Sequence, residues 1–254
     1  MRKKREFIDG TGAWRQSNFF LREYFFPFGC SICGAVLVKA GETWYGLCDE
    51  CRAGIERDLA ENRQSECCGL CGKPLISEHR RCLSCRKDDA QNRAYDRVSV
   101  LFPYTGKYRR LLAAYKFSKN LALGNFFAEK IAQTLDLTGI SPETHIVPVP
   151  PRPGKIRESG WDQVEYMARL LKKSNSGLPV NRCLKRLPSQ SQKKLGRDSR
   201  QTNLKGRIVT VREPPKRAVI IDDVMTTGAT LDACATALKE GGAEAVYGLC
   251  LFYD

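Results

Sequence analysis

One stretch of the sequence, from Ala218 to Gly242, constrains the fold more than any other. It opens with four apolar residues, 218–221, three of them β-branched, a pattern typical of a short buried strand in a parallel sheet. The adjacent carboxylates of Asp222 and Asp223 follow, and then a loop of small and hydroxyl-bearing residues. A helix is predicted over 231–240, stopped by two glycines. The stretch therefore predicts an α/β fold with a parallel sheet.

The loop between this strand and this helix predicts a phosphate site. Backbone N–H groups at a helix N-terminus point at a bound anion, and the helix dipole favours negative charge there. A glycine in the loop lets the backbone approach closely and can take a positive φ, while threonine hydroxyls add donors. The predicted phosphate-binding residues are Thr226, Thr227, Gly228, Ala229 and Thr230.

Two carboxylates beside a phosphate site need their own explanation, because they repel an anion. A ribose diol supplies one, since Asp222 and Asp223 can each accept a charge-assisted hydrogen bond from a hydroxyl. A bound Mg²⁺ would offset the repulsion. The stretch resembles the motif with which type I phosphoribosyltransferases bind phosphoribosyl pyrophosphate (PRPP). The alternative is a buried strand followed by a solvated turn.

Eight of the chain's 12 cysteines form four C-x-x-C pairs between positions 30 and 85. The sequence has no apolar run near the roughly 20 residues of a membrane span and no signal-peptide core, so a cytoplasmic location is predicted. In that compartment, cysteine pairs favour metal over disulfides. Two pairs complete one tetrahedral site, so two structural Zn²⁺ ions are predicted. The ligands are Cys30, Cys33, Cys48, Cys51, Cys68, Cys71, Cys82 and Cys85.

The zinc segment leaves some choices open. Sequential pairing is favoured over interleaved pairing. Cys67 is a spare that could replace Cys68, and His79 is either a substitute ligand or, more simply, an exposed loop histidine. Three single cysteines read as small apolar residues: Cys183, Cys234 and Cys250.

Three parts of the chain are predicted. Residues 1–26 are dense in aromatics and predict a helix packed on the ribbons, with membrane contact as the less favoured alternative. Residues 27–93 form a double zinc ribbon, and 94–254 form the α/β domain. Further strands are predicted at 97–102, 145–150 and 245–252, and helices at 108–115, 123–135 and from about 160 to 173.

Positive charge is concentrated around the predicted site. Residues 152–217 hold eighteen Lys and Arg against five Asp and Glu, a net +13, nearly the +14 of the whole chain. Ligands of open α/β sheets bind outside the carboxyl ends of strands, so the loop after 145–150 should meet the 222–230 loop. Candidate contacts to pyrophosphate on this basic surface are Lys116, Arg152, Lys155, Arg157 and Arg200. Solvated turns are the alternative, and the segment 186–207 resembles a lid or interaction surface.

An ordered combination of motifs adds a family resemblance. The C-x-x-C pairs are followed by the Val147-Pro148-Val149-Pro150 strand, by 157–163 (RESGWDQ), by Gln192, Leu195, Arg200 and Asn203, and by the Asp222-Asp223 motif. From about residue 22 onward this resembles the ComF family of competence-associated, phosphoribosyltransferase-like proteins. The resemblance implies a bacterial cytoplasmic protein that handles incoming single-stranded DNA, with a DNA-uptake helicase or other competence protein as partner.

Two departures from that family's pattern matter. Ser159 stands where the family usually has an arginine, which weakens one phosphate contact, although Asp162 keeps the role of helix N-cap. Thr226 stands where some purine phosphoribosyltransferases carry a base-contacting carboxylate, so no general base is assigned. The prediction is therefore a PRPP- and Mg²⁺-binding protein that releases pyrophosphate. Its alternative is a non-catalytic module that holds single-stranded DNA and keeps PRPP as a ligand or a vestigial site.

Overall fold

The structure of the chain is a computed structural model that describes residues 29–86, 93–173, 178–188 and 206–254. Two predictions lie outside the described residues: the aromatic helix over 1–26, and the basic residues around Arg200. Among the helices that are described, none has the length and apolar composition needed to cross a bilayer.

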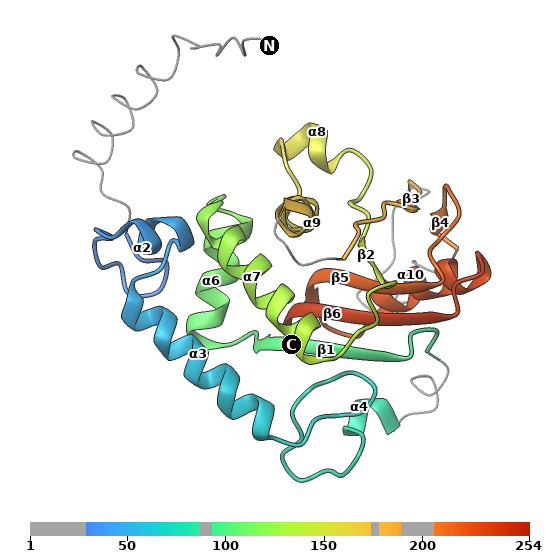
Figure 1. Ribbon diagram of the computed structural model, residues 1–254, viewed down its shortest axis with the longest axis horizontal. Helices are drawn as coiled ribbons and strands as arrows, with labels where there is room; N and C mark the ends of the chain where they lie inside the picture. Colours follow the sequence, from blue (N-terminus) through green and yellow to red (C-terminus); the bar gives the residue numbers. More distant parts are fainter. Residues whose placement is uncertain (1–28, 87–92, 174–177, 189–205) are drawn as a thin grey trace, which may run out of the picture.

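A four-stranded, fully parallel sheet forms the centre of the molecule, with the strand order β1-β6-β5-β2 (Figure 1). Its strands are β1 (Arg97–Pro103), β2 (His145–Pro148), β5 (Arg217–Met225) and β6 (Ala245–Tyr253). The predicted α/β fold with a parallel sheet is confirmed. The central strand β5 runs on through both carboxylates rather than ending before them.

The sheet is buried on both faces, which explains its continuous apolar strands. In β5, Val219 and Ile221 join the core on one face, and Ala218 and Ile220 join the core on the other. The first face is covered by α6 (Gly106–Lys116), α7 (Ala122–Leu137) and α9 (Gln163–Lys173). The second is covered by α10 (Ala229–Glu240) and an antiparallel pair, β3 (Leu184–Arg186) and β4 (Ile208–Thr210).

Local sequence explains where the helices near the sheet edge begin. The Asp162 carboxylate accepts the backbone N–H groups of Val164 and Glu165, each at 3.0 Å, and so caps α9 as predicted. The short helix α8 (Lys155–Ser159) lies between two glycines with positive φ, Gly154 and Gly160. These glycines turn the chain sharply enough to aim α8 and α9 at the end of β5.

The cysteine-rich part contains α2 (Ala40–Tyr45), α3 (Asp49–Gln64) and α4 (Leu83–Arg86). Its side chains do not form a separate core. Leu47 and Ile55 belong to the core under α7, and Leu70 belongs to the core on the opposite face of the sheet. Residues before and after the predicted boundary at residue 93 therefore share the same hydrophobic cores.

Candidate functional site

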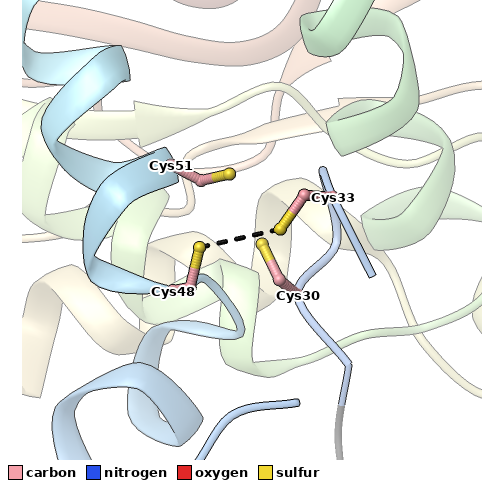
Figure 2. Close-up of side chains that lie close together, drawn as sticks. All are labelled: Cys30, Cys33, Cys48 and Cys51. Atoms are coloured by element: carbon pink, nitrogen blue, oxygen red, sulfur yellow. Dashed lines mark hydrogen bonds between the residues drawn. The ribbon is translucent and has the colours of Figure 1, made fainter. Parts of the chain in front are cut away.

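Four cysteines of the first ribbon converge at one point (Figure 2). Cys30 and Cys33 come from a loop, and Cys48 and Cys51 from the start of α3. Their sulfur atoms all lie within 4.8 Å of one another, and the Sγ atoms of Cys33 and Cys48 are 3.7 Å apart. A tetrahedral Zn²⁺ with bonds of about 2.3 Å to sulfur places its ligands about 3.8 Å apart. The cluster therefore fits Zn²⁺.

The second ribbon repeats this geometry. Its sulfurs, from Cys68, Cys71, Cys82 and Cys85, also lie within 4.8 Å of one another, and those of Cys71 and Cys82 are 3.7 Å apart. In both clusters the first C-x-x-C pair closes as a tight turn followed by a glycine with positive φ. Sequential pairing is thus confirmed, and the two clusters could hold two structural zinc ions.

Backbone donors favour the thiolate form of one cysteine in each cluster, and the thiolate is the form that binds zinc. Burial alone would raise the pKa of Cys30, but N–H groups of Cys33, Cys48 and Ile32 lower that pKa to about 7. The equivalent Cys68 has its pKa lowered to about 7 against burial in the same way.

The remaining cysteines stay outside the clusters. Cys67 is exposed, with its sulfur 3.5 Å from the carbonyl oxygen of Ser65, so Cys68 and not Cys67 is the ligand. His79 is exposed, lies outside both clusters and faces Glu66 instead. The single cysteines are buried as predicted: Cys183, Cys234 and Cys250.

A cleft of about 370 Å³ opens at the carboxyl end of the sheet. It brings together seven of the predicted site residues: Lys116, Arg152, Lys155, Asp222, Asp223, Thr226 and Thr230. Three polar residues that the sequence did not single out as ligand contacts join them: Asp162, Gln163 and Arg186. Arg157 lines a neighbouring groove instead, and Thr227, Gly228 and Ala229 are not among the described residues that line the cleft. Both loops that were expected to meet at this edge do so.

The two carboxylates at the end of β5 have different surroundings because strand residues alternate between faces. The Asp223 carboxylate accepts hydrogen bonds from Lys116 Nζ at 2.8 Å and from Gln163 Nε2 at 2.6 Å. Burial would raise the pKa of Asp223, but the charge and hydrogen bond of Lys116 prevail and lower it. Burial and the neighbouring charge of Asp223 together raise the pKa of Asp222. Lys116 therefore stabilises the charged form of Asp223, whereas Asp222 is harder to ionise than a free carboxyl group.

Lys116 was predicted as a phosphate contact, and the structure pairs it with Asp223 across 107 residues of sequence. Gln163 extends this network, because its Oε1 accepts from Lys155 Nζ at 2.5 Å while its amide nitrogen donates to Asp223. Lys155 also pairs with Asp162 at 2.5 Å, and Arg152 pairs with Glu158. A continuous chain of charged and amide groups thus crosses the floor of the cleft.

The loop after β5, predicted as the phosphate site, turns into α10 at a glycine. Gly228 has a φ of +75° and directly precedes α10. The side chain of Thr227 accepts the N–H of Ala229 at 3.4 Å, and both Thr226 and Thr227 are exposed. Two residues that the sequence did not single out brace this loop: Arg93 donates to the Thr227 carbonyl at 3.1 Å, and Tyr95 lies directly against Gly228.

Ser159, the residue that replaces an arginine in the family pattern, serves the local turn. Its hydroxyl lies 2.7 Å from the carbonyl oxygen of Lys155 and 2.8 Å from that of Trp161. It is not among the described residues that line the cleft.

Named relatives align with most of the chain, although no protein-family model matches it. Competence protein F of Haemophilus influenzae is 27% identical over 233 residues, covering 87% of this chain and 95% of that protein. Competence protein ComFC of Streptococcus pneumoniae is 26% identical and covers 79% and 84% of the two chains. DNA utilization protein YhgH of Escherichia coli K12 is 24% identical and covers 89% and 96%.

Proposed function

This chain belongs to the ComF family of competence proteins, and we propose that it binds PRPP in the cleft at the carboxyl end of its sheet. One observation carries the proposal: Asp222 and Asp223 line the same cleft as Thr226 and Thr230, the two ends of the predicted phosphate loop. The carboxylates suit a ribose diol, and the helix N-terminus suits the 5-phosphate. Lys155 and Arg186, on the other wall, suit the pyrophosphate.

The network around Asp223 orients this site. Lys116 and Gln163 both donate to the same oxygen of the Asp223 carboxylate, Oδ2, and so fix its orientation. Asp222 accepts the backbone N–H of Asp223 at 2.8 Å through Oδ1, which fixes its rotamer. Both carboxylates are thereby held in place before the ligand arrives, which reduces the ordering cost of binding.

Mg²⁺ accompanies PRPP in this proposal. Carboxylate oxygens are the ligands that hard divalent cations prefer, so Asp222 and Asp223 fit such an ion together with oxygens of PRPP. The ion would neutralise the charge of the pyrophosphate.

The reaction class that fits this ligand is phosphoribosyl transfer. A nucleophile forms a bond to C1 of the ribose while the bond from C1 to the pyrophosphate oxygen breaks, and pyrophosphate leaves. Cationic side chains on the wall of the cleft stabilise the charge that develops on the leaving group. Measuring pyrophosphate release from PRPP with candidate acceptors tests this step, and binding without release for every acceptor would reduce the function to ligand binding.

Calorimetric titration with PRPP and Mg²⁺ tests the site itself. The double variant Asp222→Asn with Asp223→Asn removes two charge-assisted hydrogen bonds. It should weaken the binding of PRPP by about 3 kcal/mol, roughly a hundredfold in affinity. Asp136→Asn, on an exposed carboxylate of α7 that does not line the cleft, is the matched control. Equal affinity for the wild type and the double variant would refute the proposal.

A second function, binding of single-stranded DNA, rests on the groove beside the cleft. This groove, of about 430 Å³, has prolines and the exposed apolar side chains of Ile156 and Leu187 in its wall, with cations around them. Its cations are Arg152, Arg157, Lys185 and Arg186. Positive charge along a groove is the electrostatic part of single-strand binding, and the exposed apolar side chains offer contact surface for bases. The competence and DNA-utilization names of the relatives agree with a role in DNA uptake.

This second function predicts affinity that falls steeply as salt rises, because neutralised phosphates release counterions. Arg157→Gln with Lys185→Gln should lower the slope of log affinity against log salt by about 1 to 2, whereas Lys216→Gln, outside the groove, should leave it unchanged. A slope near zero for the wild type would rule out electrostatic binding.

A further inference from the structure

A second cavity, of about 390 Å³, lies at the opposite edge of the sheet from the cleft. Its wall is formed by the amino ends of β1, β5 and β6 and by the loop that follows α7. Arg217, in this wall, and Asp223, in the cleft, are six residues apart on β5, which separates them by about 20 Å. The cavity is therefore distinct from the proposed PRPP site, and both can be occupied at once.

Two arginines give the cavity its charge. Arg97 begins β1 and Arg217 begins β5, with β6 between them and a stagger of two residues, so their backbones lie about 12 Å apart. Long side chains can converge on one anion from that separation. Within the described part of the chain neither guanidinium has an ion pair, and none of the described lining residues is an Asp or Glu. Two unpaired guanidinium groups without a counter-charge favour a phosphate or carboxylate.

A buried hydroxyl in the same wall is also unpaired. Thr144 is only 1% exposed and lines the cavity, and its Oγ1 has no hydrogen-bond partner among the described residues. A buried polar atom without a partner is costly, and native structures rarely keep one without a reason. A polar ligand in the cavity would supply the missing partner.

The rest of the wall combines apolar side chains and one aromatic ring with the hydroxyl-bearing residues Ser99, Thr138 and Ser141. Val219, Leu249 and Ile140 line it, together with the half-buried ring of Tyr247 between the two arginine-bearing strands. The volume falls in the range of sites for small organic molecules, so an inorganic anion would leave most of it empty. A ligand that fills it combines an anionic group with a ring or apolar body.

We propose that this cavity binds a small phosphorylated metabolite with a ring-bearing body. Its phosphate lies between the guanidinium groups of Arg97 and Arg217. Its body lies against Tyr247 and Val219, and a polar atom of the ligand meets the hydroxyl of Thr144.

NMR titration of the full chain separates this cavity from the cleft. The backbone amides of Gly139 and Gly248 report on the cavity, and that of Gly228 reports on the phosphate loop of the cleft. The probes are dAMP, ribose 5-phosphate, inorganic phosphate and unphosphorylated deoxyadenosine. We expect dAMP to shift the signals of the cavity amides and to saturate them below about 10 mM. Inorganic phosphate should bind more weakly, and deoxyadenosine should cause no shift.

Arg97→Gln with Arg217→Gln should lower the affinity for dAMP, measured at the cavity amides, at least tenfold. The shift that any probe causes at the Gly228 amide should not change. Lys216→Gln is the matched control, because Lys216 neighbours Arg217 but pairs with Glu244 at 3.2 Å and does not line the cavity. If none of the three phosphorylated probes shifts the cavity amides, or if the double variant binds them as tightly as the wild type, the proposal is overturned.

Thr144→Val provides a second test that does not alter charge. Because it removes an unpaired hydroxyl, the ligand-free variant should melt no lower than the wild type, while dAMP should bind several-fold more weakly. A variant that melts lower without the probe and binds dAMP with unchanged affinity would show that the hydroxyl has a structural role, and the assignment would fail.

Discussion

The two cysteine clusters are built from the same C-x-x-C pairs and have the same sulfur geometry, yet they support different parts of the molecule. The first lies against helices: Asn120 donates to the Ser31 hydroxyl at 2.9 Å, and the buried Lys130 on α7 pairs with Glu56 on α3 at 3.0 Å. The second lies against the sheet, where the N–H of Val98 in β1 donates to the Leu70 carbonyl at 2.9 Å. The same type of cysteine cluster thus packs against helices at one place and against strand β1 of the sheet at another.

The second cluster is also close to the proposed site. Cys71 and Cys85 share a core with Tyr95, and Tyr95 in turn lies against Gly228 in the phosphate loop. Arg93, two residues before Tyr95, holds the carbonyl of Thr227 and pairs with Asp232 on α10 at 3.5 Å. We therefore expect damage near the first cluster to reduce stability, and damage near the second to reduce ligand affinity.

The largest expected effect comes from the metal. Structural zinc contributes roughly 10–16 kcal/mol in small modules, and both clusters lie in cores shared with the sheet. Metal analysis should find about two Zn²⁺ per chain. Cys68→Ser should lose one of them and lower the melting temperature strongly. Cys67→Ser, at the neighbouring exposed cysteine, should keep both; equal zinc loss in the two variants would contradict the assignment of ligands.

The next effect separates stability from binding at the first cluster. Lys130 is 3% exposed and donates to Glu56, Glu129 and Gln133, so Lys130→Met leaves three acceptors without this donor. Because Glu56 is half exposed and can be solvated, we expect a loss of about 2 kcal/mol in unfolding free energy, less than for a fully buried pair. Affinity for PRPP should not change, and chemical denaturation with parallel calorimetry checks both. A large loss of PRPP affinity would refute the separation.

The converse effect belongs to the second cluster. Arg93→Ala removes the donor to the Thr227 carbonyl and the partner of Asp232, and so loosens the predicted phosphate loop. We expect PRPP affinity to fall about tenfold, near 1.4 kcal/mol, with about 1 kcal/mol lost in stability, because the pair is long, at 3.5 Å, and only partly buried. Arg109→Ala, on the exposed face of α6, is the control. Unchanged affinity for the Arg93 variant would mean that the loop keeps its shape without this support.

These links mark the limit of what the sequence could predict. Cysteine pairs and the strand, loop and helix around Asp222 are patterns of neighbouring residues, so their spacing carried the information. The support from Arg93, 134 residues before Thr227, depends on tertiary packing. Lys116 was read as a free cation for the same reason, because a single sequence shows a charge without its distant partner Asp223. For the same reason, the sequence did not predict which surface each cysteine cluster packs against.

The smallest expected effect tests the contact between the second cluster's core and the loop directly. Gly228→Ala is strained because φ is +75°, which costs about 1 kcal/mol. It is also crowded, because the added Cβ would lie 3.0 Å from the Tyr95 hydroxyl oxygen. Tyr95→Phe removes that oxygen and relieves the crowding but not the strain. The double variant should therefore recover about 0.5 kcal/mol relative to the sum of the single variants, measured by chemical denaturation and by PRPP titration.

The Tyr95→Phe variant alone should change little, because no described side chain or backbone group forms a hydrogen bond with its hydroxyl. Gly242→Ala is the matched control for strain: its φ is +102° and no atom lies within 4 Å of the added Cβ. Its cost should be the same with Tyr95 or with Phe at position 95. If the two glycine variants show equal coupling energies with position 95, the contact between Tyr95 and Gly228 does not link the second cluster to the loop. Coupling confined to position 228 would mean that the sheet-bound cluster, unlike the helix-bound one, sets the shape of the phosphate loop.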